Sequence, residues 1–401
     1  MPALSKLLAA PLVYKLWRRD HLRYIFRDLL NPASQEAQDD RSHLIAVLDW
    51  LCRAQDILDN RDDAGGISAG WSYEDGWLPG YPETSGYIVE TFLAAAEILD
   101  NPDYKKRAGR ILDWELSIQN PDGSFPGHFG ETGSRPVIFN TGQIMFGLTE
   151  GFLHLQRQEC LDGAVRAGQW LLKNQDDDGC WRRNTHGGII HTYNSRAAWS
   201  LLRTARLANN LKLERGAEKN LRWAMSCQTE SGWFEQNSFK LNQAPYTHTI
   251  AYAIRGLLEG GILLDDNKMV AAASKAAYSV LLKMDGRGWL AGAFADEWVA
   301  KGGYCCLTGL AQFSIIWSRL GYLKGDELFL EGAKRANSYL KRNHVLLGNQ
   351  SPDHGGIAGS QPIWGAYSRF EYPNWAAKFF ADAVMLQMEN REIPSAFGKQ
   401  P

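Results

Sequence analysis

The sequence predicts an all-α protein, an (α/α)6 toroid of six helical hairpins with an N-terminal helical extension, and three observations support this fold class. A glycine next to an aromatic or apolar residue recurs six times, at intervals of about 55 residues and about 67 for the last. Two helix-like segments flank each copy, and strand-like alternation is rare, so we expect little sheet. The copies are Gly65-Gly66-Ile67, Asp122-Gly123-Ser124-Phe125, Asp178-Gly179-Cys180-Trp181, Ser231-Gly232-Trp233-Phe234, Arg287-Gly288-Trp289 and Gly355-Gly356-Ile357.

The two segments of each pair differ in polarity. The first is amphipathic, which is typical of a helix with one face in solvent. These outer helices are expected at 42–58, 104–119, 160–175, 216–228, 269–284 and 329–344. The second is more uniformly apolar, as in Ile250-Ala251-Tyr252-Ala253-Ile254, and is expected to be buried on most sides. These inner helices are expected at 84–99, 139–155, 193–208, 246–264, 306–321 and 372–389.

One repeated unit accounts for most of the 401 residues, so we expect a single toroid domain at 41–392, preceded by the extension at 1–40 and followed by a tail at 393–401. The extension mixes basic residues with Leu, Val, Trp and Phe. It predicts either a helix packed across one end of the toroid or a peripheral contact with a membrane or a lipid-linked substrate. The basic residues are Lys6, Lys15, Arg18, Arg19, Arg23 and Arg27.

The composition limits the classes of molecule that the protein is expected to bind. A net charge of −2 argues against nucleic acid, and no run of eighteen apolar residues predicts a membrane span. The N-terminus lacks the pattern of a signal peptide, and the six cysteines lack the spacing of a disulfide framework or metal site. We therefore expect a cytoplasmic protein, with membrane association left open, that uses no cofactor and no metal.

The functional site is expected at one rim of the toroid. The connections from outer to inner helix are long and carry most of the tryptophans, and long loops on one rim often carry function. They lead into the inner helices, whose N-termini attract an anion. Candidate catalytic residues at these helix starts are Glu83, Tyr87, Tyr193, His248 and Tyr372. Candidate substrate-binding residues are Asn140, His191, Asn194, Arg196, Tyr246, Arg255, Tyr304, Arg369, Glu371, Trp71, Trp77, Trp298 and Trp364.

The residue types suggest what this rim binds. Tyr, His and Arg are poor helix caps, so their recurrence points to chemistry, whereas the Thr, Ser and Asn residues beside them are expected to cap. Arginine can hold a carboxylate by two hydrogen bonds, although an ion pair with a nearby glutamate is the alternative. Flat tryptophan faces suit sugar rings, although tryptophans after the repeat glycines are expected to pack repeat on repeat. The capping residues are Thr84, Thr141, Ser195, Thr249 and Asn374.

Three segments resemble the glutamine-to-tryptophan repeats of squalene cyclases and protein prenyltransferase β subunits, and this resemblance implies the toroid. The segments are 119–125, 175–181 and 228–234, which read Gln119 to Phe125, Gln175 to Trp181 and Gln228 to Phe234. The chemistry of these families is less well matched. The chain has no Asp-x-Asp-Asp motif, and Lys301 and Gly303 stand where a prenyltransferase would place zinc ligands.

Two further segments resemble glucuronyl C5-epimerases and toroid uronate lyases. Tyr81-Pro82-Glu83-Thr84 is similar to Tyr-Pro-Thr-Thr of the C-terminal epimerase domain, and Arg369-Phe370-Glu371-Tyr372 is similar to Arg-Trp-Asp-Tyr. The chain lacks the β-rich N-terminal region of that family. The resemblance implies an enzyme that acts on a glycan containing uronic acid.

Abstraction of the C5 proton of a uronate builds charge on its carboxylate, which needs cations or amide donors and an acid/base group near C5. Arg369, Arg196 and Asn194 are candidates for the first role. Tyr372, Tyr193 or His248 would take the proton, and Tyr87 or Glu83 would return it. Return of the proton gives an epimerase, and loss of the C4 substituent gives a lyase.

Other function classes stay open. A glycoside hydrolase needs two facing carboxyl groups about 5 to 10 Å apart. Glu83 is the best candidate for one of them, although a helix N-terminus would lower its pKa and disfavour an acid role. A terpenoid cyclase-like enzyme and a non-catalytic glycan-binding toroid are the remaining alternatives. The rim carboxylates available for hydrolysis are Glu83, Asp296, Glu297, Asp353 and Glu371.

Overall fold

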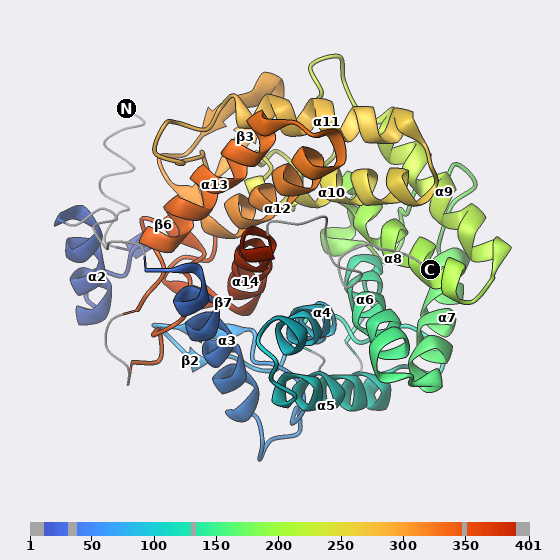
Figure 1. The fold of residues 1–401 in the computed structure, drawn as a ribbon, viewed down its shortest axis with the longest axis horizontal. Helices are drawn as coiled ribbons and strands as arrows, with labels where there is room; N and C mark the ends of the chain where they lie inside the picture. Colours follow the sequence, from blue (N-terminus) through green and yellow to red (C-terminus); the bar gives the residue numbers. More distant parts are fainter. Residues whose placement is uncertain (1–11, 31–37, 130–133, 347–350, 390–401) are drawn as a thin grey trace.

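The computed structural model describes residues 12–30, 38–129, 134–346 and 351–389, and most of these form a ring of helical hairpins (Figure 1). The inner helices are α4 (Pro82–Ile98), α6 (Ile138–Leu155), α8 (Ser195–Leu207), α10 (Thr247–Leu263), α12 (Leu307–Lys324) and α14 (Asn374–Glu389). The outer helices are α3 (Asp40–Asp56), α5 (Asp103–Ile118), α7 (Gln158–Lys173), α9 (Leu211–Ser226), α11 (Asn267–Leu281) and α13 (Glu327–Arg342). The all-α toroid is confirmed, and the expected helices begin and end within a few residues of these bounds.

The ring closes because the last hairpin packs against the first. Each inner helix packs on the next, and α14 packs on both α4 and α3, so the last hairpin meets the first. The inner helices are buried on nearly all sides, as their apolar sequences predict. In α4, every residue from Pro82 to Ala96 is buried, whereas the outer α5 buries only one stripe of side chains.

The recurring glycines join each hairpin to the next one. All six have a positive φ, between 77° and 99°, which L side chains rarely adopt. A Cβ on Gly123 would lie 2.3 Å from the carbonyl oxygen of Arg166 on α7, and a Cβ on Gly355 would lie 2.2 Å from that of Ala46 on α3. Glycine is therefore required because the loop backbone presses against the following outer helix, and the sixth contact closes the ring.

A glutamine four residues before the glycine secures this contact in three hairpins. The Gln175 amide donates to the carbonyl oxygens of Gly179 (3.0 Å) and of Gly216 on α9 (2.9 Å). Gln119 and Gln228 form the matching pairs of bonds one repeat before and one repeat after. The glutamine thus bridges its own loop and the next outer helix, which explains the spacing from glutamine to glycine.

Short strands occur only in the rim loops of the described residues, so the expectation of little sheet is confirmed. β2 (Gly76–Trp77), β1 (Gly70–Ser72) and β7 (Glu371–Pro373) form an antiparallel sheet in that order, with Trp71 opposite both Trp77 and Tyr372. β3 (Ala293–Ala295) pairs with β4 (Val299–Lys301), and β5 (Cys305–Cys306) pairs with β6 (Ser360–Gln361). These pairs hold the loops on one face of the ring.

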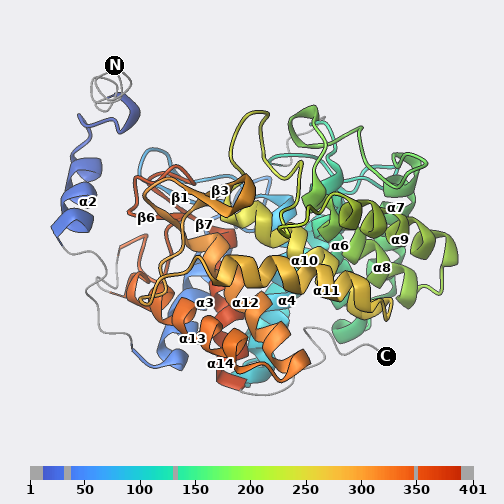
Figure 2. The same ribbon diagram turned by 90° about the horizontal axis from the view of Figure 1, so that it is seen from above.

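The N-terminal extension contains α2 (Arg19–Leu30), which lies at one side of the toroid (Figure 2). His21 stacks on Phe370 with ring centroids 3.8 Å apart, and Asp28 accepts a hydrogen bond from the backbone nitrogen of Ile363 (2.9 Å). None of the helices in the described ranges is long and apolar enough to cross a bilayer. Lys6 and the tail at 393–401 lie outside the described residues, and the membrane contact stays a prediction.

Candidate functional site

A cavity of about 350 Å³ opens at the rim where the inner helices begin. Several sequence candidates line it, namely Glu83, Tyr87, Asn140, Tyr193, Tyr246 and His248. Further residues from the loops and from the inner helices complete the wall, and they are Tyr81, Phe139, His186, Phe239, Lys240, Gln243, Tyr252, Ala366, Tyr367, Ser368 and Trp375. The rim location predicted from the long loops agrees with this cavity.

A closed circuit of aromatic rings surrounds the cavity. Successive ring centroids lie between 4.3 and 6.0 Å apart, within the range of favourable aromatic pairs. The rings follow one another in the order Phe139, Tyr252, His248, Tyr367, Tyr246, Phe239 and Tyr193, and Tyr193 returns to Phe139. Because each ring rests on two neighbours, the walls are held in fixed positions.

Glu83, in the first turn of α4, is the carboxyl group among the lining residues. One of its oxygens accepts a hydrogen bond from the Tyr81 hydroxyl (2.8 Å). Burial raises the pKa of Glu83 to about 7, although the Tyr81 bond and the charge of Arg196 act in the opposite direction. The expectation that the helix N-terminus would lower this pKa is wrong because loss of hydration dominates. Glu83 can therefore both give and take a proton near neutral pH.

His248 on α10 is a neutral hydrogen-bond donor. The side-chain amide of Gln312 on α12 donates to its Nδ1 (2.6 Å), so the ring proton resides on Nε2. Burial and the charge of Arg196 lower the pKa of His248 to about 3. The imidazole consequently stays uncharged at neutral pH, and it fits stabilisation of a substrate oxygen better than proton abstraction.

Two phenol groups of the wall have no hydrogen-bond partner. The hydroxyl oxygens of Tyr87 and Tyr193 are buried and unpaired within the described residues. Burial raises the pKa of both phenols well above the usual value, so they remain protonated. A buried hydroxyl without a partner costs free energy, and a bound polar ligand removes that cost.

Arg196 is a buried neighbour of this site, although it does not line the cavity. Its Nε donates to Gln143 (2.6 Å), whereas both terminal nitrogens lack partners in the described chain. Five aromatic rings surround the guanidinium, the nearest being Phe146 at 4.9 Å. Burial and the nearby Arg255 lower the pKa of Arg196 to about 10, so it is still charged at neutral pH. Within the described residues Arg196 forms no ion pair with a glutamate, the alternative that the sequence left open for it.

A buried ionic network lies further along the inner helices. Arg203 on α8 donates to Glu90 on α4 (2.7 Å) and to Glu150 on α6. Lys378 on α14 contacts Glu90 at 3.6 Å and forms a closer bond with Asp382. The network therefore joins four inner helices through buried, paired charges.

Tyr372 and Glu371 do not line the cavity, which corrects their assignment to the site. They belong to β7, where Tyr372 is buried against Tyr73 (5.9 Å between centroids). Burial raises the pKa of Tyr372, although the nearby charge of Arg27 on α2 acts in the opposite direction. Trp71 and Trp77 are likewise outside the cavity lining. They pack on each other in the same sheet, and Trp77 also packs on Trp50.

Other substrate-binding candidates have structural roles. The Nε of Arg369 donates to the backbone oxygen of Trp364 (3.1 Å), and its guanidinium lies over Tyr14. Trp298 donates to Ser231 and packs on Trp233, so it joins two loops. Arg369, Trp298 and Tyr304 lie outside the lining of this cavity, which corrects their assignment to it, and Trp364 lines a separate cavity on the outside of the toroid.

Three candidates lie just behind the wall. His191 stacks on Tyr193 (4.4 Å) and contacts the backbone oxygen of His186 through Nε2 (2.7 Å). Asn194 is buried with both side-chain polar atoms unpaired in the described chain. Arg255 lies 3.7 Å from Glu259, whose carboxylate is held by Arg319 at 2.6 and 2.9 Å. These residues support the cavity wall rather than line it.

The expected capping residues do not cap. The hydroxyls of Thr84 and Thr249 donate to the backbone oxygens of Tyr81 and Tyr246, and Asn374 donates to Ser68. Helices α4 and α10 have no side-chain cap. The two threonine hydroxyls thus bond to the carbonyl three residues earlier, at the start of their own helix, instead of accepting from a free backbone N–H group.

Most of the loop residues of the wall were not predicted from the sequence. Tyr81 directly precedes α4 and Phe139 lies in the first turn of α6, so both could have been found from their position. Phe239, Lys240 and Tyr367 come from long loops without a repeat pattern, so no sequence signal marked them. Within the described residues, no three His, Cys, Asp or Glu side chains form a group suited to a metal ion.

Comparison with known proteins supports the fold assignment. The squalene-hopene cyclase C-terminal domain matches residues 81–257. A squalene-hopene cyclase of Zymomonas mobilis subsp. mobilis is 24% identical over 246 residues, which cover 54% of this chain and 36% of that protein. The chain thus spans about a third of the length of this curated relative.

Solved structures resemble the chain over most of its length. Cellobiose 2-epimerase from Bacillus thermoamylovorans superposes with a TM-score of 0.69 at 14% identity, covering 88% of this chain and 98% of that one. Unsaturated glucuronyl hydrolase from Bacillus sp. GL1 gives 0.67 at 12% identity, covering 87% and 97%. The chain is an α/α toroid, and at these identities the likeness establishes the fold.

Proposed function

We propose that this protein is a carbohydrate-active enzyme that transfers a proton at a ring carbon of an acidic sugar, with Glu83 as its acid/base group. The observation that supports this proposal most strongly is the Glu83 carboxyl. It lines a cavity walled by aromatic rings, and its pKa is about 7. A group with a pKa near the working pH is the most effective proton carrier. Such perturbed carboxyls in cavities mark functional sites.

The side chains of the cavity wall favour a sugar as the substrate. The aromatic faces can stack on the C–H faces of a pyranose ring, and the Tyr87 and Tyr193 hydroxyls need polar partners. The cellobiose 2-epimerase and glucuronyl hydrolase with this fold act, by their names, on sugars. Their likeness adds support at the level of the fold, and the residues of the cavity carry the proposal.

Proton transfer at carbon fits better than glycoside hydrolysis by two carboxyl groups. Such hydrolysis needs a second carboxyl group about 5 to 10 Å from the first. Asp296, Glu297, Asp353 and Glu371 do not line the cavity, which leaves Glu83 as the carboxyl in its lining. Proton abstraction next to a carboxylate needs one acid/base group on each face of the ring, and the second can be a phenol.

The roles follow from charge and hydrogen bonding. Lys240 at the cavity wall would pair with the sugar carboxylate, and Nε2 of His248 would donate to an oxygen that gains charge. Ionised Glu83 would take the C5 proton, and Tyr87 or Tyr193 would supply a proton to the opposite face. Return of a proton there yields an epimer, and loss of the C4 substituent yields an unsaturated product.

Incubation with uronate-containing oligosaccharides in heavy water tests this proposal. Deuterium at C5 without cleavage indicates epimerisation, and new ultraviolet absorbance from an unsaturated uronate indicates a lyase. Accumulation of reducing ends without either signal would overturn proton transfer in favour of hydrolysis. Binding without any of the three products would overturn the enzyme assignment and favour a glycan-binding protein.

An isoprenoid cyclase is the second candidate, because residues 81–257 match the squalene-hopene cyclase domain and aromatic walls can stabilise carbocations. Protonation of a carbon–carbon double bond requires a strong acid, however, and burial shifts the pKa of Glu83 in the opposite direction. Conversion of a linear polyprenyl substrate to a cyclic hydrocarbon, detected by mass spectrometry, would favour this candidate.

A further inference from the structure

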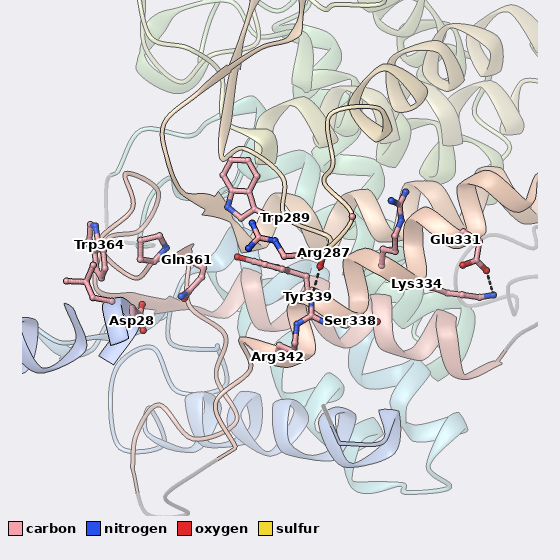
Figure 3. A pocket seen from close by; sticks show the side chains of 14 residues that line it. Asp28, Arg287, Trp289, Glu331, Lys334, Ser338, Tyr339, Arg342, Gln361 and Trp364 are labelled. Atoms are coloured by element: carbon pink, nitrogen blue, oxygen red, sulfur yellow. Dashed lines mark hydrogen bonds and ion pairs between the residues drawn. The ribbon is translucent and has the colours of Figure 1, made fainter. Parts of the chain in front are cut away.

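A second cavity lies on the outside of the toroid, between α13, the signature loop of the fifth hairpin and the N-terminal extension (Figure 3). Its volume is about 900 Å³, and it shares no lining residue with the cavity inside the ring. Arg287 and Trp289 come from the signature loop, Trp364 from the loop before β7, and Asp28 from α2. Together with α13, four parts of the chain therefore build this cavity.

The cavity is positively charged. Four cationic side chains and two carboxylates line it, and one of the cations, Arg287, is paired with Asp285, which is not a lining residue (3.1 Å). Asp28 already accepts from Arg27 and from a backbone amide, and Glu331 is paired with Lys334 at 2.7 Å. The other two arginines of the lining, Arg335 and Arg342 of α13, form no ion pair with a carboxylate in the described part of the chain. Arg342 donates to the backbone oxygen of Arg287 (2.7 Å) and lies over the Tyr339 ring, and the Nε of Arg335 is buried without a partner.

Arg335 lacks the hydrogen-bond acceptor that the equivalent arginine of another repeat has. Arg335 and Arg166 occupy equivalent places, since their carbonyl oxygens contact the signature glycines Gly288 and Gly123. The Arg166 guanidinium donates to Gln119, four residues before Gly123. Met284 stands four residues before Gly288 and offers no such acceptor. The Nε of Arg335 is accordingly buried without a hydrogen-bond partner among the described residues.

Aromatic rings stand beside these cations. Figure 3 shows Trp289 close to Arg287 and Tyr339, with Trp364 and Gln361 at the side toward α2. Flat aromatic faces bind bases and sugar rings, and guanidinium groups bind phosphate by paired hydrogen bonds. A phosphate carries a charge of about −1.5 to −2 and three acceptor oxygens, so it can accept hydrogen bonds from two arginines at once.

We propose that this outer cavity binds a phosphate ester of a sugar or nucleoside, with Arg335 and Arg342 on the phosphate and Trp289 and Trp364 beside the ring. The site is separate from the cavity of Glu83 and does not depend on the reaction proposed there. Its place between α2 and α13 means that the ligand would also hold the extension against the toroid.

Isothermal titration calorimetry with glucose 1-phosphate, uridine diphosphate and inorganic phosphate tests the proposal. We expect both organic phosphates to bind, and Arg335→Gln and Arg342→Gln each to weaken binding about tenfold or more, as expected for a lost charged hydrogen bond. Trp364→Leu should weaken the organic phosphates and leave inorganic phosphate unchanged. Arg222→Gln on outer helix α9 is the matched control, because Arg222 is paired with Glu218 (2.7 Å) and lies outside the cavity.

Circular dichroism of each variant confirms that it is folded, and the two arginine variants serve as independent tests. The proposal is overturned if neither organic phosphate binds wild-type protein at concentrations up to about 1 mM. It is also overturned if both folded arginine variants bind like wild type. Loss of binding in Lys240→Gln alone would move the ligand to the inner cavity and likewise refute the outer site.

Discussion

Replacing Glu83 by glutamine should stabilise the protein at alkaline pH while removing its acid/base group. The unfolded chain ionises this carboxyl near 4.5, whereas the folded protein does so near 7. Between these values the folded state holds a proton that the unfolded state has lost, so stability falls as pH rises. The difference is about 2.5 pKa units, which corresponds to roughly 3 kcal/mol above pH 7. Glutamine avoids this loss because it stays neutral and keeps an oxygen that can accept the Tyr81 hydrogen bond.

Urea unfolding of both proteins at several pH values between 4 and 9 measures this effect. The two unfolding free energies should agree near pH 4 and diverge toward pH 8, with Glu83→Gln the more stable. Glu218→Gln on the exposed side of α9 is the control, and its effect should stay within about 1 kcal/mol at every pH. A difference between Glu83→Gln and wild type that does not change with pH would refute the raised pKa of Glu83.

Three further predictions concern packing, buried charge and pH. Gln175→Met should lower the unfolding free energy by about 2 to 4 kcal/mol in urea titrations, because two carbonyl oxygens lose their donor; an unchanged midpoint would contradict the bridging role. Lys378→Met should cost about 3 to 5 kcal/mol in the same assay, since it leaves Asp382 buried without its cation; a neutral effect would show that water reaches the network. Burial lowers the pKa of His344 to about 3, so stability should fall as pH drops from about 6.5 toward 4, and His344→Gln should flatten this slope in thermal melts; an equal slope in both proteins would contradict it.

Much of the fold could be predicted because each of the six repeats imposes the same physical constraint on the sequence. A glycine with positive φ against an outer-helix carbonyl, as at Gly123, tolerates no other residue, and its spacing therefore survives in the sequence. The contrast between outer and inner helices follows from burial. Contacts such as that of Gln175 with Gly216 were not predicted, because they join positions 41 residues apart.

The site was predicted in part. Residues in the first turns of inner helices, such as Glu83 and His248, face the cavity because all inner helices start at the same rim. Tyr372 and Arg369 occupy a similar place in the sequence, but Tyr372 pairs with Trp71 in the sheet of β1 and β7, and Arg369, just before β7, donates to Val13 of the N-terminal extension. Pairing between β1 and β7 joins residues some 300 positions apart, and two short strands carry too little signal to reveal it.

The pKa of Glu83 was also misjudged from the sequence. A glutamate in the first turn of a helix ordinarily has a lowered pKa because of the helix dipole. The surrounding aromatic wall removes water from the carboxyl, and that loss of hydration outweighs the dipole. The number of rings that meet at one point depends on the closure of the toroid, which local sequence does not reveal.

The most direct test of the central claim compares deuterium incorporation by wild type and Glu83→Gln. Each protein is incubated with a uronate-containing oligosaccharide in heavy water, and the deuterium at C5 is measured by NMR and mass spectrometry. We predict incorporation by wild type and a rate lower by about 100-fold or more in Glu83→Gln, as expected for loss of a general acid/base group. Equal incorporation by the two proteins, or cleavage by wild type without any deuterium at C5, would contradict the assignment of Glu83.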